Sequence, residues 1–120
     1  MGTADVADWI HDVKAQPGSA AIGMILVHQG IMRGTSRSGE PVRGMMLSAD
    51  RDRLESTLAE AQTWPGVFAV RGWANEGSLS VGDDIMEVLV AGGIRDNVFA
   101  ALQRLVSLMK SEVLSESESR

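Results

Sequence analysis

The stretch of residues 92–110 constrains the fold of this chain most, because two glycines lead into one long amphipathic pattern. Apolar residues recur there every three or four positions, which predicts a helix over residues 95–113 with one apolar face. A helix with such a face packs against another apolar layer, so the chain must build a sheet or further helices. The predicted core face consists of Val98, Phe99, Leu102, Leu105, Val106 and Met109.

The same stretch holds candidate functional residues at both ends. A helix start exposes unpaired N–H groups and a partial positive charge, so Gly92, Gly93 and Arg95 are candidates for binding an anion such as phosphate. Lys110, near the other end, is a candidate catalytic amine. The alternatives are that the glycines only turn the chain from a strand into a helix, and that Lys110 is a surface lysine near a helix C-terminus.

The rest of the chain divides into two helix patterns and five strand patterns without a regular βαβ alternation. This order predicts one α+β domain over residues 1–113, with helices packed on a mostly antiparallel sheet. The polar run that follows predicts a disordered tail over residues 114–120. The predicted helices cover residues 5–16 and 50–63, and the predicted strands cover 20–27, 42–47, 67–73, 79–81 and 85–91.

Composition argues against several classes of function. The formal net charge is −5, so the chain lacks the overall basic footprint of a nucleic-acid-binding protein. No apolar run approaches the roughly 20 residues that span a bilayer, and the N-terminus lacks the basic segment of a secretory signal. We therefore expect a cytoplasmic protein that binds neither nucleic acid nor membrane. The chain contains no cysteine, and His11 and His28 form no metal-binding pattern, so we expect neither a metal nor a resident cofactor.

Arginines gather locally in and beside a Gly- and Ser-rich segment over residues 30–41, which predicts a flexible loop between two strands. Arg33, Arg37 and Arg43 lie within eleven positions of one another, and such a group suits phosphate binding. Solvated loop arginines are the alternative. His28, at the end of a predicted buried strand, is expected to be a hydrogen-bonded structural histidine.

Several short motifs follow one another in a fixed order between about residues 20 and 110. They are Gly30-Ile31-Met32-Arg33 after an apolar strand, Trp64-Pro65-Gly66 after a helix, the turn of residues 76–83, the helix start of residues 93–99, and Lys110. None of these motifs is specific alone. Their order and spacing together resemble the large, catalytic subunit of molybdopterin synthase.

The resemblance implies a hammerhead-like α/β fold, a homodimer and a site for cyclic pyranopterin monophosphate. Sulfur would arrive as a C-terminal Gly-Gly thiocarboxylate on a small ubiquitin-like partner subunit, and two transfers would give molybdopterin. Arg33 and Arg95, with Gly93 and Arg37 beside them, would bind the anionic pterin, because guanidinium groups match phosphate oxygens. Lys110 would act as an acid, a base or a nucleophile.

Two departures from the family pattern leave the function open. Ile94 stands where the family has a histidine beside the arginine, and Ser117 stands where it has a second lysine. A substitute for the missing imidazole is the alternative to the structural role of His28. The first possible function is that of an enzyme, a divergent molybdopterin synthase catalytic subunit. The second is that of a non-catalytic relative, which binds a pterin, another phosphorylated ligand or the ubiquitin-like partner. The third is a purely structural dimeric domain that binds no anion.

Overall fold

The computed structural model describes residues 5–119, with side chains through residue 117, and it has an α+β fold. The α+β class predicted from the sequence is confirmed. The first four residues of the predicted domain and Arg120 of the predicted tail lie outside the described residues. The elements are α1 (Val6–Lys14), a 3₁₀ turn η1 (Ser19–Ala21), β1 (Met24–Ile31), β2 (Gly44–Ala49), α2 (Arg51–Ala61), β3 (Val67–Ala74), β4 (Gly77–Ser80), β5 (Asp84–Gly92), α3 (Arg95–Leu108), a π-helical turn η2 (Met109–Val113) and β6 (Leu114–Ser119).

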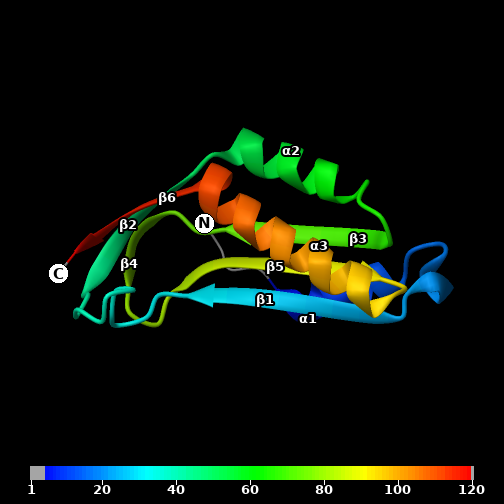
Figure 1. Cartoon of the computed structure of the whole chain (residues 1–120), viewed down its shortest axis with the longest axis horizontal. Coiled ribbons are helices and arrows are strands. Elements are labelled where there is room, and N and C mark those ends of the chain that lie inside the picture. Colours follow the sequence, from blue (N-terminus) through cyan, green and yellow to red (C-terminus); the bar gives the residue numbers. More distant parts are fainter. Residues whose placement is uncertain (1–4, 120) are drawn as a thin grey trace.

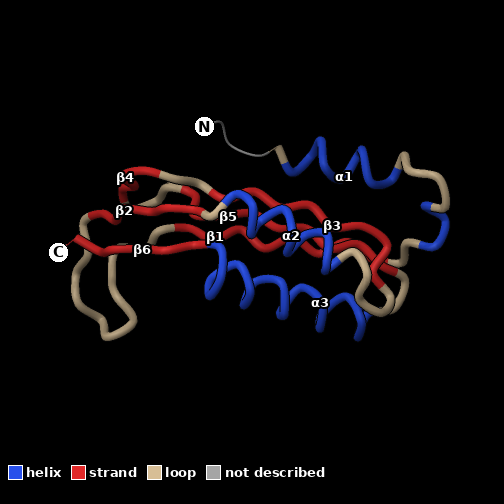
Figure 2. The backbone as a smooth tube through the Cα atoms, turned by 90° about the horizontal axis from the view of Figure 1, so that it is seen from above, coloured by secondary structure: helices blue, strands red, loops and turns tan. Residues whose placement is uncertain are grey.

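The first sheet is antiparallel, has the strand order β1-β5-β3 and forms the middle layer of the molecule. Its central strand β5 is buried continuously from Met86 to Gly92, as expected for a strand that is covered on both faces. Figures 1 and 2 show how this happens: α2 and α3 lie over one face of the sheet, while α1 lies over the other. Alternate side chains of β5 therefore enter two different cores.

The larger core lies between the sheet and the pair α2 and α3. Leu105 and Met109 of the helical segment have no exposed surface, and they pack with Val88 and Val90 of β5. The smaller core lies under α1, where Val13 is fully buried against Leu89 and Ala91. Burial of apolar surface at about 25 cal/mol per Å² makes these two layers the main source of stability.

The predicted helix over residues 95–113 forms, but its last turn widens into the π-helical turn η2. Val98, Leu105 and Met109 are buried as predicted. Phe99 is a correction, since 53% of its surface is exposed. The apolar stripe is narrower than the list of apolar residues suggested, because the sheet covers only one side of α3.

A second sheet, with the order β4-β2-β6, continues from one end of the first and leads to the C-terminus (Figure 1). The prediction of a disordered tail over residues 114–120 was wrong for 114–119, which form β6. This strand pairs with the whole of β2, from Gly44↔Ser119 to Ala49↔Leu114. The polar residues of β6 need no apolar core, because the backbone of β2 supplies their hydrogen-bond partners. The chain therefore has two sheets where one was predicted.

Two boundaries near the arginine-rich segment also differ from the prediction. The strand predicted over residues 20–27 begins later, at Met24, and continues to Ile31, so Gly30 belongs to β1 and not to the loop. The loop that follows is tied by an isolated bridge between Thr35 and Pro41, and Met32 at its base is 1% exposed. Within residues 5–119, none of the helices combines the length and the apolar character that a membrane crossing needs.

Candidate functional site

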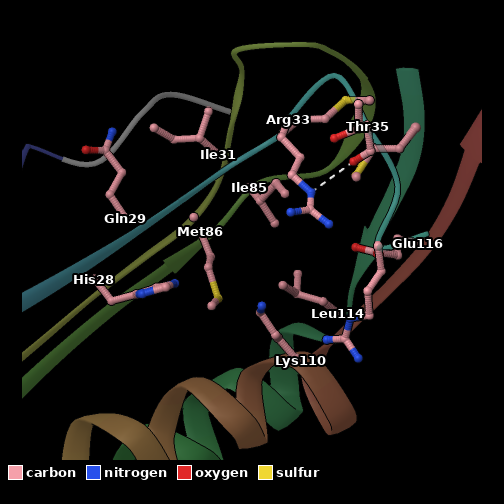
Figure 3. A pocket seen from close by; sticks show the side chains of 14 residues that line it. His28, Gln29, Ile31, Arg33, Thr35, Ile85, Met86, Lys110, Leu114 and Glu116 are labelled. Carbon is pink, nitrogen blue, oxygen red and sulfur yellow. Dashed lines mark hydrogen bonds between the residues drawn. The ribbon is translucent and has the colours of Figure 1, made fainter. Parts of the chain in front are cut away.

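A cavity of about 820 Å³ lies where the C-terminal end of the α3 segment meets β1 and β6 (Figure 3). Strand β1 forms one wall, the π-helical turn and β6 form another, and the arginine-rich loop closes one end. Residues from four separate stretches of the sequence, 28–37, 45, 85–86 and 110–116, therefore meet here. The lining residues are His28, Gln29, Gly30, Ile31, Met32, Arg33, Thr35, Arg37, Met45, Ile85, Met86, Lys110, Leu114 and Glu116.

Three cations reach this cavity. Lys110 projects into it from the π-helical turn, an irregularity that is frequent at functional sites (Figure 3). Arg33 is held by its Nε, which donates a hydrogen bond of 2.9 Å to the carbonyl oxygen of Thr35. This contact leaves the terminal guanidinium nitrogens of Arg33 without a hydrogen bond to the described residues. Arg37 lines the cavity from the same loop.

The cavity also has an apolar part that is rich in methionine. Met86 has no exposed surface, Met32 is 1% exposed and Met45 is 6% exposed. Ile85 and Leu114 complete this surface. Thioether side chains are flexible and polarisable, so this surface can adapt to a flat ring, while the three cations attract negative charge. The cavity therefore combines a positively charged part with an adaptable apolar part.

Glu116 of β6 is the one acidic side chain among the described residues that lines the cavity. It makes no ion pair with Lys110 or Arg33 among the described residues, and it is exposed to solvent. Three cations against one carboxylate leave the cavity with an excess of positive charge, although the chain as a whole is acidic. The sequence could not show the position of Glu116, because it was assigned to a disordered tail.

The hydrogen bonding of His28, which also lines the cavity, differs from the prediction. His28 was predicted to be a hydrogen-bonded structural histidine, yet its Nε2 is buried and has no hydrogen-bond partner among the described residues. Burial lowers the pKa of His28, and the positive charge of Lys110 lowers it further. The sequence contained a signal for the position of His28. Side chains alternate along a strand, so Leu26, His28 and Gly30 share one face of β1.

The structure separates Arg95 and Gly93 from the other predicted site residues. Arg95 begins α3 and Lys110 follows its last turn, so about 22 Å along the helix axis divide them, at about 1.5 Å per residue. Figure 1 shows these two positions at opposite ends of the helix. The structure thus brings together Lys110, Arg33 and Arg37, and it leaves Gly93 and Arg95 at a distant surface of the same chain.

Close packing accounts for Gly92, which precedes α3. A Cβ on Gly92 would lie 2.2 Å from the carbonyl oxygen of Gly66 and 2.8 Å from Val98 Cγ2. Real Cβ atoms do not approach a backbone oxygen so closely, so this position admits only glycine without a shift of the backbone. A Cβ on Gly93 would lie 3.0 Å from the carbonyl oxygen of Ala21, a tight contact that a shift of a few tenths of an ångström relieves. Packing therefore explains Gly92 more strictly than Gly93.

No group of three or more His, Asp or Glu side chains within residues 5–119 is arranged to bind a metal ion. The described cavity residues offer cations, one carboxylate, one imidazole and thioethers, which is a poor donor set for a divalent metal.

Residues 3–112 of the chain match the family model described as MoaE protein. The chain belongs to the MoaE family. None of the curated protein sequences matches it significantly.

Solved structures of MoaE-type proteins share the fold. The molybdopterin cofactor biosynthesis protein E of Burkholderia multivorans is 23% identical with a TM-score of 0.75, and the match covers 99% of this chain and 84% of that one. A molybdopterin synthase from Staphylococcus aureus is 19% identical with a TM-score of 0.70, covering 82% and 74%. A chain from the complex of subunits 1 and 2 of the Helicobacter pylori molybdopterin-converting factor is 15% identical with a TM-score of 0.68, covering 96% and 78%.

Proposed function

We propose that this MoaE family member is a molybdopterin synthase large subunit that transfers sulfur to cyclic pyranopterin monophosphate in the cytoplasm. Membership of the family ties the chain to molybdenum cofactor biosynthesis. One observation carries the step from family to chemistry: Lys110, Arg33 and Arg37 surround a single cavity with a methionine-rich wall. The motifs that carry the family resemblance include Arg33 and Lys110, so the cavity and the resemblance support the same site.

The cavity suits this substrate in two respects. The terminal guanidinium nitrogens of Arg33 can bind phosphate oxygens, because the contact of Nε with Thr35 already fixes the plane of the guanidinium group. Arg37 adds a second guanidinium from the same loop. The methionine-rich wall offers polarisable contacts to the pterin ring. Phosphate recognition and ring recognition are thus assigned to different walls of the cavity.

The sulfur comes from outside the chain, since the chain contains no cysteine. We assign the donor to the C-terminal thiocarboxylate of a small ubiquitin-like subunit. A related large-subunit fold is found in the Helicobacter pylori complex of two subunits, which supports a partner of this kind. Lys110 is the one lysine of the cavity, and its ammonium group can stabilise negative charge that develops during transfer.

Arg95 enters the proposal through a second copy of the chain. It lies too far from Lys110 to share a cavity within one chain, because about 22 Å of helix separate them. In a homodimer of suitable geometry, the start of α3 of one copy can face the cavity of the other. Gly93, next to the start of that helix, would approach the ligand in the same way. The proposed site is therefore composed of two copies.

A single-turnover assay tests the proposed function. Purified chain is mixed with thiocarboxylated small subunit and cyclic pyranopterin monophosphate, and molybdopterin is measured over time. We expect product from the unmodified chain and at least a 100-fold slower reaction from Lys110→Ala, because a charged group at the reacting atoms contributes on the order of 3 kcal/mol. Lys14→Ala is the matched control, since Lys14 is the other lysine of the chain and is exposed at the end of α1.

Other outcomes would contradict parts of this proposal. Saturable binding of the pterin or of the small subunit without product would instead identify a non-catalytic binding module of the same fold. Equal rates for Lys110→Ala and Lys14→Ala would remove Lys110 from the reaction. Absence of both binding and product would refute the function while leaving the family assignment intact.

A further inference from the structure

His28 occupies a strand position that directs its side chain toward the cavity. It pairs with Val88 of β5, and Gly30, two positions further along β1, pairs with Met86. Side chains alternate along a strand, so His28 shares the face of Val88 and Met86, over which α3 and its final π-helical turn lie. His28 therefore reaches the same cavity as Lys110 from the opposite wall (Figure 3).

The Nε2 atom of His28 is one of three buried side-chain atoms without a hydrogen-bond partner among the described residues, with Thr57 Oγ1 and Trp73 Nε1, and it is the one whose residue lines the cavity. Most buried polar side-chain atoms are paired, and an unpaired one destabilises the folded state. A histidine that only supported the fold would gain from a protein partner here. The unpaired nitrogen instead indicates a partner that is not part of the chain.

A glycine and a flexible side chain lie beside this nitrogen. A Cβ on Gly30 would be in ordinary van der Waals contact with both groups, 3.6 Å from His28 Nε2 and 3.4 Å from Met86 Cγ, so position 30 borders the nitrogen directly. Figure 3 shows Met86 between the imidazole of His28 and the amine of Lys110. Met86 is unbranched, so its thioether can move aside at low cost when a ring enters the cavity.

The imidazole is neutral at neutral pH, because burial and the nearby charge of Lys110 both lower the pKa of His28. A neutral imidazole offers one donor and one acceptor, and it has no charge to attract phosphate. The cavity already has Arg33, Arg37 and Lys110 for anionic groups. Since these three cations bind the anionic groups, the neutral imidazole of His28 is suited to an uncharged polar edge of the ligand.

We infer that His28 is a specificity-determining residue of this cavity, whose Nε2 forms a hydrogen bond with a polar atom of the bound heterocycle once Met86 has moved aside. The inference rests on the proposed function, since it takes the pterin as the heterocycle. Binding of the ring satisfies a nitrogen that is unpaired in the free protein. Ligands that carry phosphate but no ring do not use this contact.

Calorimetric titration of the full chain tests this role with two probes, cyclic pyranopterin monophosphate and inorganic pyrophosphate. His28→Phe retains a ring of similar shape without nitrogen, and we expect it to weaken pterin affinity about tenfold while leaving pyrophosphate affinity unchanged. His28→Gln places an amide near the position of Nε2, and we expect its pterin affinity to stay within about threefold of the original. His11→Phe is the matched control at the other histidine, which is exposed on α1.

Thermal unfolding of the ligand-free variants separates this role from a structural one. Removal of an unpaired buried nitrogen predicts that His28→Phe melts a few degrees higher than the unmodified chain. A lower melting temperature combined with equal loss of both probes would overturn the inference, because it would show a supporting role in the fold. Equal pterin affinity of His28→Phe and the unmodified chain would overturn it as well, with the proposed function intact. Absence of pterin binding to the unmodified chain would refute both proposals.

Discussion

The two ends of α3 look alike in the sequence as candidate sites, yet the structure gives them opposite characters. At the first end, Gly92 lies so close to the carbonyl oxygen of Gly66 that a Cβ would come within 2.2 Å of it. At the second end, Lys110 borders a cavity of about 820 Å³ and makes no ion pair with the described residues. The first end is filled by the chain itself, whereas the second is open to a ligand.

This difference shows how glycine and charge should be interpreted at a helix terminus. A glycine can mark a ligand that approaches the backbone, or a second segment of the same backbone. Here the backbone of Gly66 occupies the space beside Gly92, so packing accounts for this glycine. The signal for binding lies in polar groups that line the cavity and lack partners among the described residues, namely Lys110, the terminal nitrogens of Arg33 and Nε2 of His28.

The largest expected effect tests the packed end. Gly92→Ala forces a Cβ against the backbone of Gly66 and the side chain of Val98, and we expect a loss of about 3 kcal/mol in the free energy of unfolding. Urea denaturation measures it. Gly34→Ala is the matched control from the loop at the cavity end, because its Cβ would meet only Val81 at an ordinary 3.7 Å. Equal stability of the two variants would show that the packing account of Gly92 is wrong.

The next effect tests whether the two ends meet between copies. Arg95→Gln and Lys110→Ala are each expected to leave little synthase activity as pure proteins. If the two chains are mixed as subunits of a dimer, half of the dimers contain both variants, and each of these has one intact composite site. Recovery of about a quarter of the original activity is therefore expected in the turnover assay.

Two results of this mixing experiment would contradict a site that is shared between two copies. No recovery, with mixed dimers demonstrated by mass spectrometry, would mean that Arg95 does not serve the cavity of a second copy. Full activity of pure Arg95→Gln would mean that the first end of α3 has no part in the site at all. Either result would leave Lys110, Arg33 and Arg37 as a site within one chain.

The smallest expected effect is the pH dependence of stability that His28 causes at the cavity end of α3. Burial and Lys110 lower the pKa of His28 below its usual 6.5, so the folded chain holds this proton less tightly than the unfolded chain. The contribution of His28 to the free energy of unfolding is present above pH 6.5, and it is lost as the pH falls toward the lowered pKa of His28 in the folded chain. Arg33, Arg37 and Glu116 also line the cavity. The two arginines act on the pKa of His28 in the same direction as Lys110, and the carboxylate of Glu116 acts in the opposite direction.

We expect His28→Phe to reduce the slope of stability against pH between pH 5 and 6.5, within the one-proton limit of about 1.4 kcal/mol per pH unit. Urea denaturation across this range measures the slope, and His11→Phe is the control. An unchanged slope would show that His28 keeps its ordinary pKa in the folded chain.

Much of the fold could be predicted because its causes are local. The three- and four-residue spacing of Leu105 and Met109 indicated the last helix, and both residues are buried. The run before Gly92 indicated the central strand β5. Strand β6 could not be predicted, because its alternating Ser and Glu residues carry no apolar signal. Its order comes from the free edge of β2, a partner about 70 positions earlier in the chain.

The site was predictable in part. Arg33, Arg37 and Lys110 were named from the sequence, and they line one cavity. Arg95 was grouped with them although a whole helix separates it from Lys110, since sequence motifs do not state which end of an element faces which wall. Glu116 was missed with its strand, and the state of His28 depended on contacts that no motif reports.

The sequence by itself determined the α+β class, the positions of the helices and central strands, and the family resemblance. These follow from side-chain periodicity and from short motifs, which act over a few neighbouring residues. Only the tertiary structure decided which charges share a cavity, which glycine serves packing, and which buried nitrogens lack a partner among the described residues. Those properties depend on atoms that are distant in the chain and close in space, so they exist only after the sheets and helices have packed together.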